Sequence, residues 1–273
     1  MASSTSRAAL AGASEKLTAD TAKATPAQVA TVADEILSVA GLLRAQPRLR
    51  RALTDPARSG ADRAELLRSL LSGKLTQAAV DSLATLVAGR FGAPSELLDA
   101  TERLGVAALL DAGDRAGDLA DIEDELFRFG QIVSGNGELA VTLSDPGAPT
   151  SRRVKLVEDL LQGKAKPVTL RLVEVALEGF GGRSFETSLT RLVEMTAAKR
   201  NREVAYVTVA RPLTEGEEEA LASKLSEIYG RTVSLKIDVD PSIIGGVSVK
   251  VGADLYDGTI LRRLTEAKQA FAR

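Results

Sequence analysis

The chain has 273 residues, a net charge of −2, and neither cysteine nor histidine. These two absences exclude disulfides, thiol nucleophiles, imidazole-dependent catalytic triads and the usual zinc sites. The near-neutral charge gives no electrostatic case for binding nucleic acid. No apolar run approaches the ~20 residues of a membrane span, so we expect a soluble cytoplasmic chain. The length is sufficient for two or three domains.

Helix-starting and helix-ending residues divide the first hundred positions into short helices. Proline and small hydroxylated residues precede the helical spacing of apolar residues, and glycine or Asp-Pro ends it. Helices are predicted over residues 6–20, 25–45, 60–72 and 76–90, with a short turn over 47–54. We then expect one long, bent helix around residues 95–118, despite Gly105, Gly113 and Gly117.

A repeat with an offset of 90 residues is the most informative internal feature. Leu53-Thr-Asp-Pro56 reappears as Leu143-Ser-Asp-Pro146, and Leu70-Leu-Ser-Gly-Lys74 reappears as Leu160-Leu-Gln-Gly-Lys164 (143 − 53 and 160 − 70). Apolar residues at 32, 36, 37, 39, 42 and 43 fall on apolar residues at 122, 126, 127, 129, 132 and 133, with the spacing of one helix face. The sequence therefore predicts two tandem helical bundles, over residues 1–100 and 101–200.

The character of the chain changes after residue 200. Alternating apolar residues predict strands over 204–209 and 233–239, and a capping box at Thr214–Glu217 starts a helix between them. A third strand is expected from about Ile243, with the paired glycines 245 and 246 indicating either a bulge or a neighbouring backbone that passes too close for a side chain. A turn at Asp257-Gly258 then leads to a terminal helix. The fold class is mostly α with a smaller α+β domain: the two bundles are followed by a β-α-β-β-α domain over residues 201–273.

The two Gly-Lys pairs invite a phosphate-loop interpretation, but each lacks the glycine five residues earlier and the following Ser or Thr. Helix C-caps explain them better. Acidic clusters at 121–125 and 215–219 stand at predicted helix starts, where negative charge is favourable. We expect no catalytic residue, no metal and no cofactor.

One stretch carries a family resemblance. The run Asp240-x-Ser242-x-x-Gly245-Gly246-Val247-x-x-x-x-Gly252, continued by Asp257-Gly258-Thr259 and Arg263-Leu264, resembles the C-terminal signature of the delta subunit of bacterial F-type ATP synthases. The mitochondrial relative is the oligomycin sensitivity-conferring protein. Residues 104–146 and 182–199 resemble the start and end of the family's N-terminal helical domain, so residues 1–100 are the additional copy.

The resemblance implies a non-catalytic stator subunit, present as one copy in a hetero-oligomeric complex at the cytoplasmic face of the bacterial plasma membrane, without inserting into it. Its helical domain would hold N-terminal helices of alpha subunits in a groove, and its C-terminal domain would hold the C-terminal ends of the b subunits. We hypothesise that each copy of the repeat binds a different alpha N-terminus. The alternative is a generic cytoplasmic helical adaptor, and an enzyme is disfavoured.

Carried over by position, the groove candidates of the second copy lie on two helices. They are Ala107, Ala108, Leu110, Val168, Arg171, Leu172 and Val175. In the first copy the candidates are Ala79, Leu83, Leu86 and Val87. The candidates for the stalk-binding domain are the signature residues Asp240, Ser242, Gly245, Gly246, Val247, Gly252, Asp257, Gly258 and Leu264.

Overall fold

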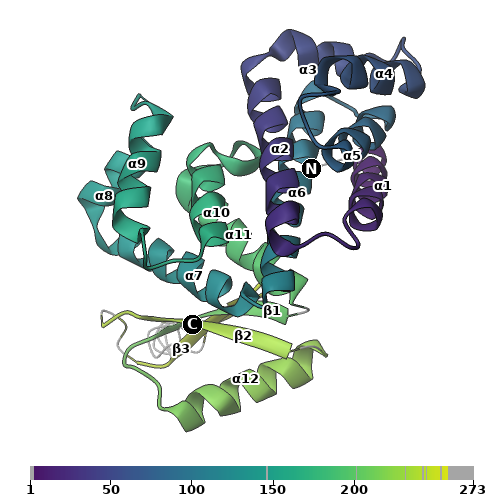
Figure 1. Cartoon of the computed structure of the whole chain (residues 1–273). Helices are drawn as coiled ribbons and strands as arrows, with labels where there is room; N and C mark the ends of the chain where they lie inside the picture. Colours follow the sequence, from purple (N-terminus) through teal and green to yellow (C-terminus); the bar gives the residue numbers. More distant parts are fainter. Residues whose placement is uncertain are drawn as a thin grey trace, which may run out of the picture. The chain divides into compact units, whose positions relative to one another are not determined.

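The computed structural model describes residues 3–145, 147–200, 202–230, 232–241, 243, 245–252 and 254–257. The chain divides into two compact units, Met1–Leu192 and Val193–Arg273. Described residues of the first unit form helices, whereas those of the second include a small mixed sheet (Figure 1). The expected fold class is confirmed.

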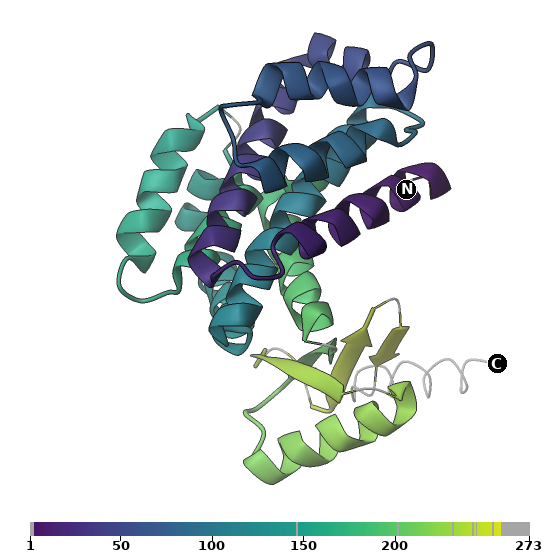
Figure 2. The ribbon, with the colours of Figure 1, turned by 45° about the vertical axis from the view of Figure 1, so that its right-hand side comes forward.

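The first copy of the repeat forms the helices that the sequence predicts and a short helix in place of the turn expected over 47–54. They are α1 (Ser4–Asp20), α2 (Pro26–Ala45), α3 (Pro47–Leu53), α4 (Gly60–Leu71) and α5 (Gln77–Ala88), followed by α6 (Pro94–Ala116). Capping boxes at Thr25 and Ser59 start α2 and α4, because the hydroxyl and the side chain three residues later satisfy free backbone amides. Figure 2 shows α1 lying beside α5 and α6, in agreement with the packing of these helices.

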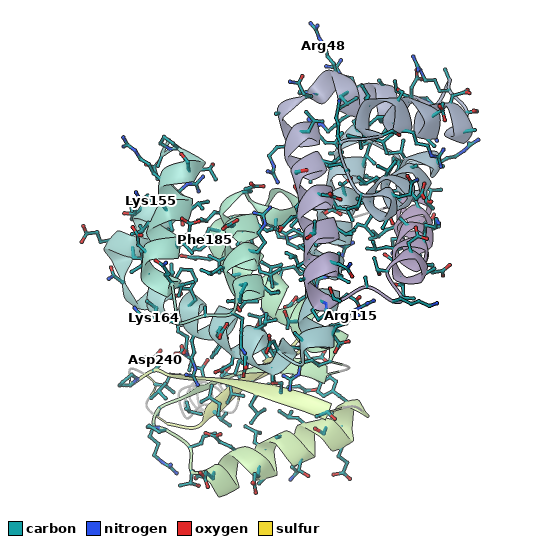
Figure 3. All side chains as sticks on the ribbon, viewed as in Figure 1. Arg48, Arg115, Lys155, Lys164, Phe185 and Asp240 are labelled. Carbon is teal, nitrogen blue, oxygen red and sulfur yellow. The ribbon has the colours of Figure 1, made fainter. Side chains whose placement is uncertain are left out.

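The second copy repeats this order. Its elements are α7 (Leu119–Gly135), α8 (Gly137–Ser144), α9 (Thr150–Leu161), α10 (Pro167–Leu177), the 3-10 helix η1 (Phe180–Gly182) and α11 (Phe185–Lys199). Helix α11 crosses from the first compact unit into the second. Its first residue, Phe185, meets Phe129 of α7 edge to face, with 6.4 Å between the ring centroids (Figure 3).

The repeat extends to individual hydrogen bonds. Arg63 Nε donates to the carbonyl of Val87 at 3.2 Å, and Arg153 Nη1 donates to the carbonyl of Leu177, 90 residues further on, at the same distance. Likewise, the residues just before α5 and α10, Thr76 and Lys166, donate their backbone amides to Glu35 and Glu125, again 90 residues apart. The two copies therefore share a packing plan as well as sequence identities.

The Gly-Lys pairs end helices, as predicted. Gly73 and Gly163 adopt positive φ angles of 75° and 71°, just after α4 and α9, where glycine is favoured. Each following lysine donates to a carbonyl four residues earlier, at 2.8 Å from Lys74 to Leu70 and at 3.1 Å from Lys164 to Leu160. These lysines satisfy free carbonyls at the helix ends.

Helix α6 is shared by both copies. The predicted long helix is confirmed, and it runs without interruption through Gly105 and across the predicted bundle boundary at residue 100. It packs against α1, α2, α3 and α5 of the first copy and against α7, α10 and η1 of the second. A Cβ added to Gly105 would lie 2.7 Å from Leu37 of α2, so the glycine permits close packing there. Gly117 ends the helix with a φ of 78°.

One helix departs from the expectation that no run approaches a membrane span. Helix α2 has 20 residues and a mean hydropathy of 1.2 in its most apolar window, enough to cross a membrane by length and composition alone. Its Val29, Ile36 and Leu43 are fully buried within the first unit, and α2 packs along α6. A core helix gives the same composition, which explains the apolar run.

The second unit is built on strands β1 (Arg202–Val209), β2 (Thr232–Val239), β3 (Val247–Val251) and β4 (Asp254–Asp257), with α12 (Glu215–Tyr229) between β1 and β2. The strand order is β2-β1-β3-β4, with β1 parallel to β2 and antiparallel to β3. Helix α12 packs against β2. The core comprises Ala205, Val207, Val209, Leu225, Val233, Val249 and Val251.

Two details of this unit differ from the prediction. Strand β3 begins at Val247 because Gly245 and Gly246 have φ angles of 137° and 92°, outside the range of a strand. The paired glycines thus form a bend before the strand and are not a bulge within it. Strand β4 was not predicted. The predicted terminal helix lies outside the described residues.

Candidate partner-binding site

The described residues provide little for chemistry. No three of their Asp and Glu side chains are grouped so that they could hold a metal ion. Several of their ionisable groups pair with one another or accept hydrogen bonds at helix starts. The candidate functional residues are the groove and signature residues that the family resemblance implies.

The second-copy groove candidates divide into core and surface residues. On α6, Ala108 and Leu110 are buried, and on α10 so are Leu172 and Val175. Ala107, Val168 and Arg171 are half-buried. Because α6 and α10 pack against each other, the buried members hold the two helices together, and the three half-buried members are the ones that a partner could reach directly.

The first-copy candidates Ala79, Leu83, Leu86 and Val87 are all buried. Helix α1 packs against α5, which carries them. The two helices come close enough that a Cβ added to Gly89 would lie 2.3 Å from the Cβ of Ala9. These four side chains therefore belong to the core of the unbound chain.

Arg171, the one charged residue among the groove candidates, is held by acidic neighbours. Its Nε donates to Asp34 of α2 at 2.6 Å, and its Nη1 pairs with Glu174. Partial burial opposes the guanidinium charge, but the hydrogen bonds to the two carboxylates raise the pKa of Arg171. This side chain thus links α10 of the second copy to α2 of the first.

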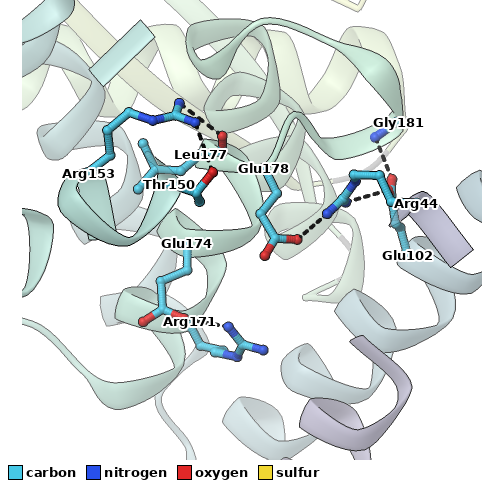
Figure 4. A network of polar contacts seen from close by, with 9 residues as sticks. All are labelled: Arg44, Glu102, Thr150, Arg153, Arg171, Glu174, Leu177, Glu178 and Gly181. Carbon is cyan, nitrogen blue, oxygen red and sulfur yellow. Dashed lines mark hydrogen bonds and ion pairs between the residues drawn. The ribbon is translucent and has the colours of Figure 1, made fainter. Parts of the chain in front are cut away.

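A second cluster, which the sequence interpretation missed, lies at the other end of α10 (Figure 4). Arg44 of α2 donates to Glu102 of α6 at 2.7 Å and to Glu178, just after α10, at 2.5 Å. The other oxygen of Glu102 accepts the amide hydrogen of Gly181 at 2.7 Å. Burial raises the pKa of Glu102, although the Gly181 amide and Arg44 act in the opposite direction. In the sequence, the one indication of this cluster was Glu102, an acidic residue on the apolar face of the predicted helix.

The signature residues of the C-terminal unit shape turns around β3. The amide of Asp240 donates to the carbonyl of Val209 at 2.9 Å, and Val247 opens β3 opposite Val209. Gly252 has a φ of 57° between β3 and β4, and Asp257 in β4 pairs with Ser248. Ser242, Gly258 and Leu264 lie outside the described residues. The described part of the signature therefore has a structural explanation in backbone geometry.

Exposed apolar side chains mark further surfaces where a partner could bind. In the helical unit, Leu42 and Leu70 are exposed in the first copy, and their equivalents Ile132 and Leu160 are exposed in the second. Val141 of α8 is also exposed. In the C-terminal unit, the exposed apolar side chains are Ile228, Val239, Leu255 and Tyr256.

Comparison with known proteins identifies the family. Residues 106–271 match the family model described as the ATP synthase delta (OSCP) subunit. Over the whole of both chains, the sequence is 62% identical to the ATP synthase subunit delta of Salinispora arenicola and 59% identical to that of Salinispora tropica. It is 42% identical to the subunit of Streptomyces griseus, over 98% of this chain and 99% of that protein. These relatives also cover residues 1–105, which the family model leaves out. The chain therefore belongs to the ATP synthase delta (OSCP) subunit family, the non-catalytic stator subunits of F-type ATP synthase.

Proposed function

We propose that this chain joins N-terminal helices of alpha subunits, in the catalytic head, to the C-terminal ends of b subunits in the stalk. Family membership makes it part of a membrane-associated ATP synthase. The observation that carries the finer proposal is the division into a helical unit and a separate αβ unit, because it gives two different surfaces for two different partners. We place the chain at the cytoplasmic face of the bacterial plasma membrane, since the relatives are bacterial.

The alpha-binding site is proposed on α6 and α10. Ala107 has a small side chain, so a partner helix can approach the backbone of α6 closely, and Val168 offers half-buried apolar surface on α10. Arg171 adds a charge at the same place, although Asp34 and Glu174 already neutralise much of it. These properties fit the apolar face of an amphipathic helix.

The first copy is proposed to bind a second alpha N-terminus. The repeat supports this, since α5 occupies in the first copy the place that α10 occupies in the second. Because the candidates on α5 are covered by α1, the partner helix would lie on the outer surface of the α1 and α5 pair. Both contacts would have to be large and slow to dissociate, since a stator resists torque continuously.

The b-subunit site is proposed on the C-terminal unit. Leu255 and Tyr256 on the edge strand β4 and Ile228 on α12 expose apolar surface among the described residues. Such surface is a common feature of protein interfaces. A generic adaptor, the second candidate, would explain the helices but not the 62% identity to a delta subunit along the whole chain.

Site-specific cross-linking in the assembled complex tests the proposal. The chain has no cysteine, so Val168→Cys and Glu215→Cys each provide a single site for a photoactivatable label. We expect the label at 168 to form adducts with alpha and the label on α12 to form none with alpha. Adducts of alpha with the α12 label alone would overturn the assignment of the helical unit to the head.

A further inference from the structure

The two helical copies are connected twice. The first connection is covalent, because α6 continues from one copy into the other. The second is a set of side-chain contacts in which Arg44 of α2 binds Glu178, just after α10, and Glu102 of α6 binds Gly181 of η1 (Figure 4). A further contact joins Asp34 of α2 to Arg171 of α10. Both copies also pack on α6, and these side-chain contacts add a direct link between α2 of the first copy and the α10 region of the second.

Arg44 is the centre of the stronger contact. Its Nη1 donates to Glu178 and its Nη2 donates to Glu102. The second oxygen of Glu102 accepts a hydrogen bond from the backbone amide of Gly181. A forked guanidinium fixes both distance and direction, which a lysine ammonium cannot do to the same extent. The chain of contacts therefore ties α2, α6, the end of α10 and η1 together.

A second attachment point lies further along the same helices. Asp34 of α2 accepts from Arg171 of α10 at 2.6 Å, and Glu174 holds the other side of that guanidinium. Asp34 and Arg44 are ten positions apart on α2, which corresponds to about 15 Å of helix. Two attachments separated by this length oppose both sliding and rotation of α2 against α10.

Burial distinguishes the Arg44 contact from ordinary surface ion pairs. The Glu102 side chain is 3% exposed, whereas the Asp34 side chain is 52% exposed. Breaking a buried pair leaves a charge without a partner in a poorly solvated place, whereas most exposed pairs contribute little. Retaining such a pair in place of apolar residues is explained if it specifies one arrangement of the helices.

We propose that Arg44 and Glu102 are positioning residues that fix the angle between the two helical copies, so that the helical unit transmits force as one rigid body. This inference goes beyond the proposed binding function and does not depend on it. It concerns the geometry of the chain alone, with no alpha or b subunit present.

The test measures a distance between the copies. Arg48 on α3 and Lys155 on α9 are exposed and lie in different copies, and both side chains point away from the ribbon (Figure 3). Because the chain has no cysteine, Arg48→Cys and Lys155→Cys accept spin labels at these two sites alone. Pulsed electron–electron double resonance then gives the distance distribution. We expect one narrow distribution in the otherwise unchanged chain.

In Arg44→Ala we expect the distribution to broaden or to gain a second population, while circular dichroism keeps its helical signal. Arg128→Ala is the control, because it removes an exposed pair with Asp124 inside α7 alone. It should leave the distribution unchanged. If Arg44→Ala fails to fold, two other changes test the proposal. Arg44→Lys removes the forked guanidinium, and the double variant Asp34→Asn with Glu178→Gln removes the exposed carboxylates. Both keep a cation beside Glu102. A distribution unchanged in every folded variant would overturn the proposal.

Discussion

Replacing Gly105 by alanine tests the close packing of the shared helix α6 against α2. The added Cβ would lie 2.7 Å from both Cγ and Cδ2 of Leu37 and 3.4 Å from Ile36, and both of these side chains are buried. Cγ is not the free end of a side chain, so relief requires movement of α2 against α6. Overpacking of this kind costs about 1–3 kcal/mol. Alanine recovers about 1 kcal/mol through its helix propensity, so an overpacking cost in the middle of this range, about 2 kcal/mol, leaves a net loss of about 1 kcal/mol.

Gly41→Ala is the matched control. Gly41 lies in α2, and a Cβ added there would meet no atom within 4 Å, so the same change should stabilise the chain by up to about 1 kcal/mol. For a unit of this size, 1 kcal/mol corresponds to a Tm change of roughly 2–4 °C. Thermal unfolding followed by circular dichroism should give a lower Tm for Gly105→Ala and a higher one for Gly41→Ala. If Gly105→Ala melts at or above the unmodified chain, the close packing of α2 on α6 is refuted.

Three further outcomes are expected. Arg63→Leu should lower the free energy of unfolding by about 3 kcal/mol in urea titration, and by more than Arg153→Leu does. Arg63 donates five hydrogen bonds to backbone carbonyls. Among the described residues, Arg153 donates two hydrogen bonds to backbone carbonyls and one to the Thr150 hydroxyl. Equal losses would contradict this account. Glu125→Ala removes the acceptor of the Lys166 amide and of the Thr169 hydroxyl, and it should cost about 1 kcal/mol in the same titration. No loss would contradict a stabilising role for these two hydrogen bonds. Glu217→Gln should lower Tm at neutral pH, with the difference disappearing as pH falls from 4.5 to about 2, because Arg211 and the Thr214 cap lower the pKa of Glu217 to about 2. The carboxylate binds its proton less tightly in the folded state than in the unfolded state. Its contribution to stability is therefore fully present above pH 4.5 and is lost as the pH falls from 4.5 to about 2. A Tm difference that persisted at pH 2 would contradict this pKa.

Local signals predicted the helical elements well. Thr25-Pro26 and the Gly-Lys pairs act through a few neighbouring residues, so their consequences can be predicted from the local sequence. The repeat predicted further structure, because the equivalent residues Arg63 and Arg153 each donate to equivalent carbonyls, those of Val87 and Leu177. The family resemblance predicted membership of the ATP synthase complex, which the comparisons confirm.

Long-range contacts were beyond such signals. Arg44 pairs with Glu102 and Glu178, which lie 58 and 134 positions away, and the sequence around Arg44 predicts neither contact. Apolar spacing also cannot separate core from interface. Val168 and Leu172 lie one turn apart on the same helix, yet Val168 is half-buried and Leu172 is buried. Four residues are also too few for alternation to announce β4.

The most direct test of the central claim is a sequential binding measurement on the full chain. A peptide with the C-terminal end of a b subunit is immobilised and saturated with the chain, and a peptide with an alpha N-terminus is then added while bound mass is recorded. If the chain links head to stalk through two units, the alpha peptide will add mass without releasing the chain. Release of the chain, or no added mass at saturating alpha peptide, would contradict the account.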